Sequence, residues 1–221
     1  MIEPWITLAI LGGIGSNIYN FLARYTLKDG DDPTTLAWFF EASRFVIFGT
    51  FLIFERPPAL TLYSFFILLL LGVIEIFSIY FFAKMHSLSH LSISSIIIRL
   101  RLVWIPILAF FFIHEILSGR EYIGLLVLLA GIIIAGMPHK LAYDKGMRYA
   151  YIFSFVGALL AVTMKAASAV ASPTLIMFAM SVPSIIVFPL LMKDPKKRIL
   201  SVFKNNATSK ISFTLLNSVS F

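Results

Sequence analysis

The stretch SFFILLLLGVIEIFSIYFFAK, residues 64–84, decides the fold, because only Glu75 and Lys84 in it carry charge. A helix needs about 20 mainly apolar residues to cross the hydrocarbon core of a bilayer. The stretch meets this requirement, so we expect it to span a membrane with one ionisable side chain near its middle. A carboxylate at that depth is costly in lipid and must face the interior of a helix bundle.

Six other stretches have a similar length and apolar character. The predicted spans are 5–23, 34–54, 64–84, 91–113, 122–138, 149–170 and 173–192. An eighth begins near residue 209, and the chain stops about halfway through it. The expected fold class is therefore an all-α, polytopic membrane helix bundle in the cell membrane, with the lipid bilayer as its solvent.

Composition agrees with this fold class. Hydrophobic residues make up 59% of the chain and charged residues 13%, with a mean hydropathy of +0.93, which is too apolar for a soluble domain. The net charge of +7 does not indicate a nucleic-acid partner, because the cations lie mainly in connectors between spans. The chain has no cysteine, which excludes disulfides, thiolate catalysis and Cys-based metal centres.

An internal repeat is visible at an offset of 140 residues. Pro33-Thr34 then falls on Pro173-Thr174, and VIF at 46–48 falls on IVF at 186–188. A unit of five helices would enter the membrane inverted in its second copy, as in many transporters. We expect a first repeat at 1–139 and a partial second repeat at 147–221. The same offset would carry a full second repeat to about residue 278, so we expect the chain to be incomplete at its C-terminus.

Ionisable side chains fall in the middle of several spans, where each needs a buried partner. In a helical hairpin, residues at equal depth have numbers that add up to twice the loop midpoint. On this basis Glu75 is level with residue 100 of the next span and with residue 42 of the span before it. We expect six residues to share one layer near the midplane. They are Glu75, Arg99, Arg101, Arg44, Glu41 and Asn17.

Two interpretations of this layer stay open. In one, a buried ion-pair network fixes the packing, with Arg44 satisfied by Glu41 one turn earlier. In the other, the excess of arginine over glutamate attracts an anionic or carboxylate-bearing ligand, and Glu75 is a candidate proton carrier. Arg101 could instead extend toward the interface or bond backbone carbonyls, which would leave a neutral site.

Other polar and small residues are expected to be structural. The small-residue spacings at Gly12 and Gly131 predict close helix packing, and Pro106 predicts a kink within its span. His86 is expected to be solvated near an interface. The acidic turn DGDDP at 29–33 is expected to be only a turn.

Enzyme and cofactor motifs are not found in the sequence. His114-Glu115 lacks the second histidine of a metalloprotease helix, and no nucleophile–base set is present. We expect no enzyme activity, no cofactor and no metal. An intramembrane enzyme would need a divalent cation at Asp29, Asp31 or Asp32.

The stretch at 71–136 resembles the second half of an EamA-type repeat of the drug/metabolite transporter superfamily. The resemblance covers 8–139 well and 147–221 partially. The residues that carry it are AKMHSLS at 83–89, Pro106, Glu115 with the polar turn after it, Gly124, Gly131, Gly136, and EASRF at 41–45, which contains Arg44.

The resemblance implies a ten-helix fold of two inverted five-helix repeats, a central substrate cavity and alternating access. Members carry amino acids, nucleotide sugars, phosphorylated sugars or drugs, often in exchange or with protons. The resemblance also implies cytoplasmic termini. The distribution of lysine and arginine instead puts the connectors at 139–148 and 193–210 in the cytoplasm and the N-terminus outside.

We therefore expect a secondary transporter, or a fragment of one, for a small polar metabolite. Glu75, Arg99 and Arg101 are the first candidates for substrate binding or proton coupling, and Glu115 is expected to be a structural residue at a helix end. The alternative is a non-transporting membrane scaffold in which the charged layer only fixes the packing. A homodimer stays open.

Overall fold

The computed structural model describes residues 6–7, 10, 12–15, 17–18, 20–21, 27, 32–55, 60–88, 91–136 and 145–204. Every regular element within these ranges is a helix, so the predicted all-α fold class is confirmed. The first predicted span, 5–23, is described only in part, and the eighth, near residue 209, lies outside the described residues.

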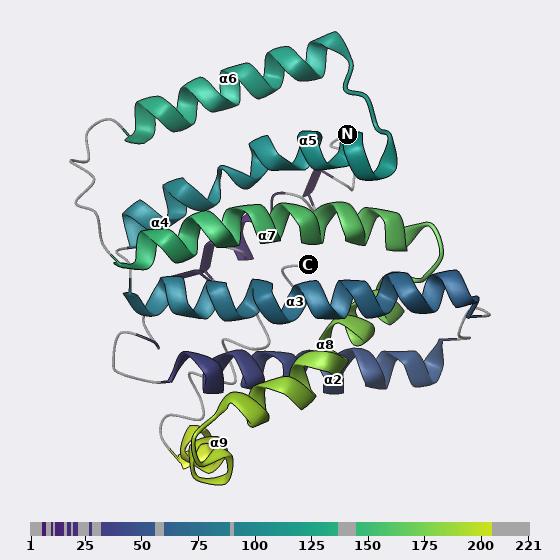
Figure 1. The fold of residues 1–221 in the computed structure, drawn as a ribbon, viewed down its shortest axis with the longest axis vertical. Helices are drawn as coiled ribbons and strands as arrows, with labels where there is room; N and C mark the ends of the chain where they lie inside the picture. Colours follow the sequence, from purple (N-terminus) through teal and green to yellow (C-terminus); the bar gives the residue numbers. More distant parts are fainter. Residues whose placement is uncertain are drawn as a thin grey trace.

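The described helices run back and forth through a bundle (Figure 1). They are α2 (Pro33–Phe54), α3 (Leu62–Leu88), α4 (Leu91–Ile98), α5 (Arg101–Ile113), α6 (Gly119–Gly136), α7 (Lys145–Ser168), α8 (Pro173–Leu191) and α9 (Pro195–Lys204). Five candidate membrane spans lie in this part of the chain, with α4 and α5 contributing one span, Ser94–Ile113. Outward-facing side chains such as Ile53 and Leu190 are 79% and 80% exposed, and a bilayer would cover them.

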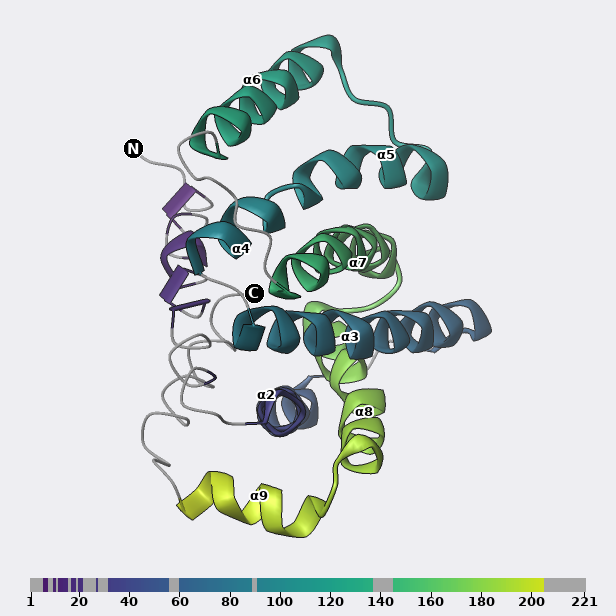
Figure 2. The ribbon, with the colours of Figure 1, turned by 60° about the vertical axis from the view of Figure 1, so that its left-hand side comes forward.

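α3 is the central helix of the bundle. It packs against α7 on one side and against α2 and α8 on the other, while α5 and then α6 lie beyond α7 (Figures 1 and 2). Two buried clusters follow α3 along its length, one containing Phe40 and Met85 and the other containing Leu71 and Met180. The apolar core is thus built on both faces of α3.

α2 and α8 begin in the same way, 140 residues apart. Asp32 accepts a hydrogen bond from the Thr35 backbone N–H at 3.1 Å, and Ser172 accepts one from the Leu175 backbone N–H at 3.3 Å. A proline follows each cap. Its missing N–H costs no hydrogen bond there, because N–H groups in the first helical turn have no partner within the helix. Figure 1 shows the two helices running in opposite directions.

The predicted span at 91–113 is not one continuous helix. α4 ends at Ile98 and α5 begins at Arg101, with a turn at Arg99 and Leu100 between them. Backbone N–H groups around this turn donate to carbonyls three residues back, at 3.0–3.1 Å, which is tighter than the α-helical pattern. Pro106 in the next turn has no N–H to donate, so the ladder is weakened on this side as well.

A second difference from the sequence analysis is α9. It lies inside the predicted connector at 193–210 and follows a short turn after α8. The connector is polar overall, but its apolar residues recur with helical spacing, as an amphipathic helix requires.

α3 and α8 approach closely where Gly72 faces Pro183. A Cβ atom at Gly72 would lie 2.6 Å from Pro183 Cγ and 3.0 Å from the carbonyl oxygen of Ala179. Close packing was predicted at Gly12 and Gly131, but a Cβ at either glycine meets no described atom within 4 Å. That prediction was wrong, because the helix spacing motif does not say which glycine faces a neighbouring backbone.

We expect Gly72→Ala to destabilise the bundle by about 1–3 kcal/mol, because the added methyl group would overpack the contact with α8. Gly131→Ala is the matched control and should be neutral or slightly stabilising, since the site is open. Thermal unfolding of the two variants in detergent measures the difference. Equal midpoints for the two variants would show that α3 and α8 are not in tight contact here.

Candidate functional site

A buried cluster of three charges joins α2 to α3. The Arg44 guanidinium lies 3.1 Å from Glu41 Oε1, one turn earlier on α2, and it also donates to Glu75 Oε1 on α3. All three side chains are at most 4% exposed. One cation is therefore shared by both carboxylates.

Not every polar atom of this cluster has a hydrogen-bond partner in the described structure. Two carboxylates against one guanidinium leave a formal charge of −1, and in the described structure Glu75 Oε2 is buried without a hydrogen-bond partner. A buried carboxylate oxygen without a donor is costly. Glu75 Oε2 therefore keeps a lone pair that no donor in the described structure uses.

A cavity of about 470 Å³ lies against this cluster. Residues from the first helical segment, α2, α3, the α4–α5 region and α7 contribute to its wall. Of the six residues expected in one layer, the cavity wall contains Asn17, Arg44, Glu75, Arg99 and Arg101. Glu41 is not in the wall and reaches the cluster through Arg44. Their roles in binding or coupling stay predictions.

The break between α4 and α5 positions two cations at this cavity. Arg99 lies in the turn and Arg101 opens α5, and both are exposed. In the described part of the chain neither forms an ion pair, so Glu75 is paired with Arg44 and not with the two arginines nearest to it in the hairpin arithmetic. Interrupted helices with unwound backbone mark the binding sites of many transporters.

Sequence reasoning missed several polar and aromatic residues of the cavity. Ser78 lies three residues after Glu75 and Ser95 four residues before Arg99, so both share a helix face with a recognised charge. That spacing was readable from the sequence. Phe82 and Phe153 also line the cavity, but nothing in an apolar span distinguishes them from core residues.

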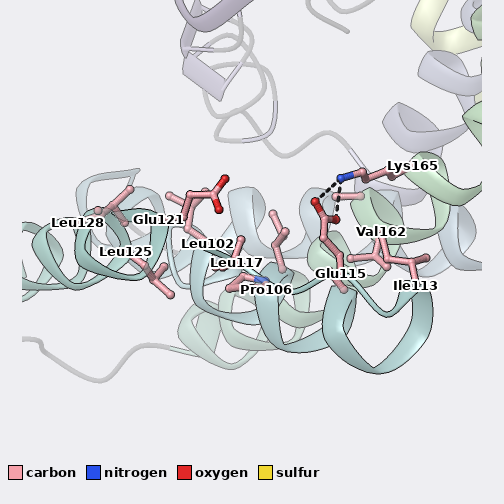
Figure 3. Close-up of a pocket in the computed structure, with 14 residues that line it drawn as sticks. Leu102, Pro106, Ile113, Glu115, Leu117, Glu121, Leu125, Leu128, Val162 and Lys165 are labelled. Carbon is pink, nitrogen blue, oxygen red and sulfur yellow. Dashed lines mark hydrogen bonds and ion pairs between the residues drawn. The ribbon is translucent and has the colours of Figure 1, made fainter. Parts of the chain in front are cut away.

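A second cleft of about 360 Å³ lies between α5, α6 and α7 (Figure 3). The Lys165 ammonium lies 2.6 Å from both carboxylate oxygens of Glu115 in this cleft. Glu121 also lines this cleft and lies just before the predicted span at 122–138. The backbone N–H and the hydroxyl of Ser118 donate hydrogen bonds to its carboxylate and lower its pKa. The charged groups of the cleft are thus paired or hydrogen-bonded, so the cleft is a weaker candidate for a polar ligand than the central cavity.

The structure also tests the predictions for His86 and for the acidic turn at 29–33. His86 is 1% exposed against the ring of Phe82, because α3 extends to Leu88 and carries it into the core, so the prediction of a solvated side chain was wrong. Asp32 of the acidic turn caps α2, while Asp29 and Asp31 lie outside the described residues. Among the described residues no group of three or more metal-binding side chains is found.

The fold and the cavity define a multi-pass membrane protein with a charged site inside the helix bundle. Residues 3–137 match the sequence profile of the EamA-like transporter family. The match covers more than half of the chain, and the chain belongs to this family of membrane transporters. No curated protein sequence matches the chain significantly.

We expect Arg44→Gln to destabilise the protein by about 3–5 kcal/mol, because it leaves two carboxylates buried without their cation. The triple variant Glu41→Gln, Arg44→Gln, Glu75→Gln keeps the shape and removes all charge, so it should recover most of the loss. Thermal unfolding in detergent compares the two. A triple variant no more stable than Arg44→Gln would contradict the shared-cation description.

Proposed function

We propose that the chain is a secondary transporter, or part of one, which moves a small carboxylate-bearing metabolite by alternating access. The observation that carries the proposal is the central cavity, which has an unsatisfied Glu75 oxygen in one part of its wall and two arginines in another. A buried polar atom left without a partner is tolerated where a ligand completes it.

The charges of the cavity indicate the class of substrate. The Glu41–Arg44–Glu75 cluster has a formal charge of −1, whereas Arg99 and Arg101 together contribute +2. Guanidinium groups bind carboxylates through paired, charge-assisted hydrogen bonds. The arginines would therefore bind the carboxylate, and Glu75 would accept a hydrogen bond from a hydroxyl or ammonium group elsewhere in the substrate.

The size of the cavity agrees with a small metabolite. A volume of about 470 Å³ lies within the range of roughly 300–1,000 Å³ found for small-molecule sites. Phe82, Phe153 and Leu160 supply apolar surface beside the charges. A substrate with one charged end and a short carbon skeleton would contact both kinds of surface.

The inverted repeat supplies the proposed mechanism. We infer a first repeat at 1–139 and a partial second repeat at 147–221, supported by the matching caps of α2 and α8 and by their opposite directions in Figure 1. Two repeats of opposite orientation can exchange conformations and so open a midplane site to each side in turn. Glu75 is the candidate to carry a proton in such a cycle.

We expect Arg99→Ala and Arg101→Ala each to reduce uptake of a carboxylate-bearing metabolite into proteoliposomes by about 10–100-fold, the loss of one charge-assisted bond. The fold should be intact, because neither side chain has an ion-pair partner in the described structure. Arg120→Ala, at the exposed start of α6, is the control and should transport normally.

Two outcomes would contradict this proposal. Full transport by both arginine variants would remove the cavity as the binding site. Absence of transport for a panel of carboxylates, amines and sugars by the folded protein would favour the non-transporting scaffold, in which the cluster only fixes packing. Glu75→Gln tests the proton separately, because it should abolish the dependence of uptake on a pH gradient while leaving exchange intact.

A further inference from the structure

α9 follows the end of α8 and lies beside the N-terminal end of α2, at the edge of the bundle (Figures 1 and 2). In Figure 1 it is seen nearly end-on while α2, α3 and α7 run across the picture, and in Figure 2 it is seen along its length. The two views place its axis roughly perpendicular to the spanning helices. This is the orientation of an amphipathic helix that lies in the plane of a bilayer surface.

Two contacts fix α9 against the bundle. The Arg198 guanidinium lies 2.9 Å from Asp32 Oδ2, the carboxylate that also caps α2. Ile199 is half-buried against the core cluster that contains Met192 and Phe40. The helix is therefore attached by one polar and one apolar contact, and these set which side of it faces away from the protein.

The side that faces away combines lysines with an apolar side chain. Lys193, Lys196 and Lys197 are exposed, and Leu200 is 64% exposed. Lys196 and Lys197 precede Leu200 by four and three residues, so the three share one face of the helix. Among the described residues 193–204, Asp194 is the one acid.

We propose that α9 is an interfacial helix that docks on the anionic phospholipid headgroups of the membrane in which the chain is embedded. Lysines around an apolar side chain are the arrangement by which surface helices bind anionic bilayers, with the apolar group entering the headgroup boundary. The negative surface complements the lysines, and the bilayer accepts Leu200. This inference does not depend on transport, because none of these residues lines the central cavity.

The test uses the absence of cysteine from the chain. Leu200→Cys carries an environment-sensitive fluorophore in the otherwise unchanged protein, reconstituted in vesicles of phosphatidylcholine with or without phosphatidylglycerol. We expect blue-shifted emission and weaker quenching by neutral acrylamide in the anionic vesicles. About 1 M NaCl should reverse both effects, since it shortens the screening length to about 3 Å.

Matched variants separate α9 from general effects of charge. Lys196→Gln should lower the ratio of docked to undocked probe about fivefold, the effect of one lysine near an anionic surface. Lys145→Gln, at the start of α7, should leave it unchanged. A probe at Ile116→Cys, 73% exposed in the connector between α5 and α6, should not respond to lipid charge.

Three results would overturn the proposal. They are identical spectra in the two kinds of vesicle, an unchanged lipid response in the combined Lys193→Gln, Lys196→Gln, Lys197→Gln variant, and a probe that responds to a soluble polyanion but not to anionic lipid. Intact folding of each variant is checked by size-exclusion chromatography in detergent. Failure of transport in these vesicles would not bear on the result, since the probe reports only on α9.

Discussion

The guanidinium group of Arg44 is the interaction on which the arrangement of α2 against α3 depends. It lies between Glu41 and Glu75, and all three side chains are buried. Buried ion pairs add little net stability, because desolvation offsets the attraction between the charges. We infer that the cluster instead sets the register of α2 against α3. Apolar helices pack at many relative depths, whereas Glu75 reaches Arg44 at only one.

The same cluster determines the character of the cavity beside it. Because the cation is shared, Glu75 keeps an oxygen without a donor in the described structure, and the arginines of the interrupted span keep their charge for another partner. A fully matched set of ion pairs would have given a sealed, structural layer. We propose that this incomplete matching suits the interior of the bundle to a ligand, whereas in the second cleft Glu115 is already paired with Lys165.

Sequence reasoning found five of the seven predicted spans and brought the charged residues to one depth, because both depend on hydropathy and on residue counting. Counting along hairpins brought Glu75, Arg99 and Arg101 to one height, and the structure places all three in one cavity wall. The break at Arg99 was not predictable in the same way, since no glycine or proline stands at residues 99–100 to mark a turn. Gly72 was missed because its importance comes from Pro183 on a distant helix. α9 was missed because its segment is rich in lysine and was interpreted as a polar connector, although its apolar residues recur with helical spacing.

The interrupted span has a consequence for biogenesis. On the scale of translocon-mediated insertion, an arginine at the centre of a helix costs about 2.5–3.5 kcal/mol, while a leucine or isoleucine returns only about 0.3–0.6 kcal/mol. A segment with Arg99 and Arg101 at its middle is therefore a marginal substrate for the insertion machinery by itself. It enters more readily once α2 and α3, which are synthesised first, offer a polar interior in which its arginines are not exposed to lipid. The order of the helices along the chain thus places α2 and α3, with their buried charges, in the membrane before these arginines arrive.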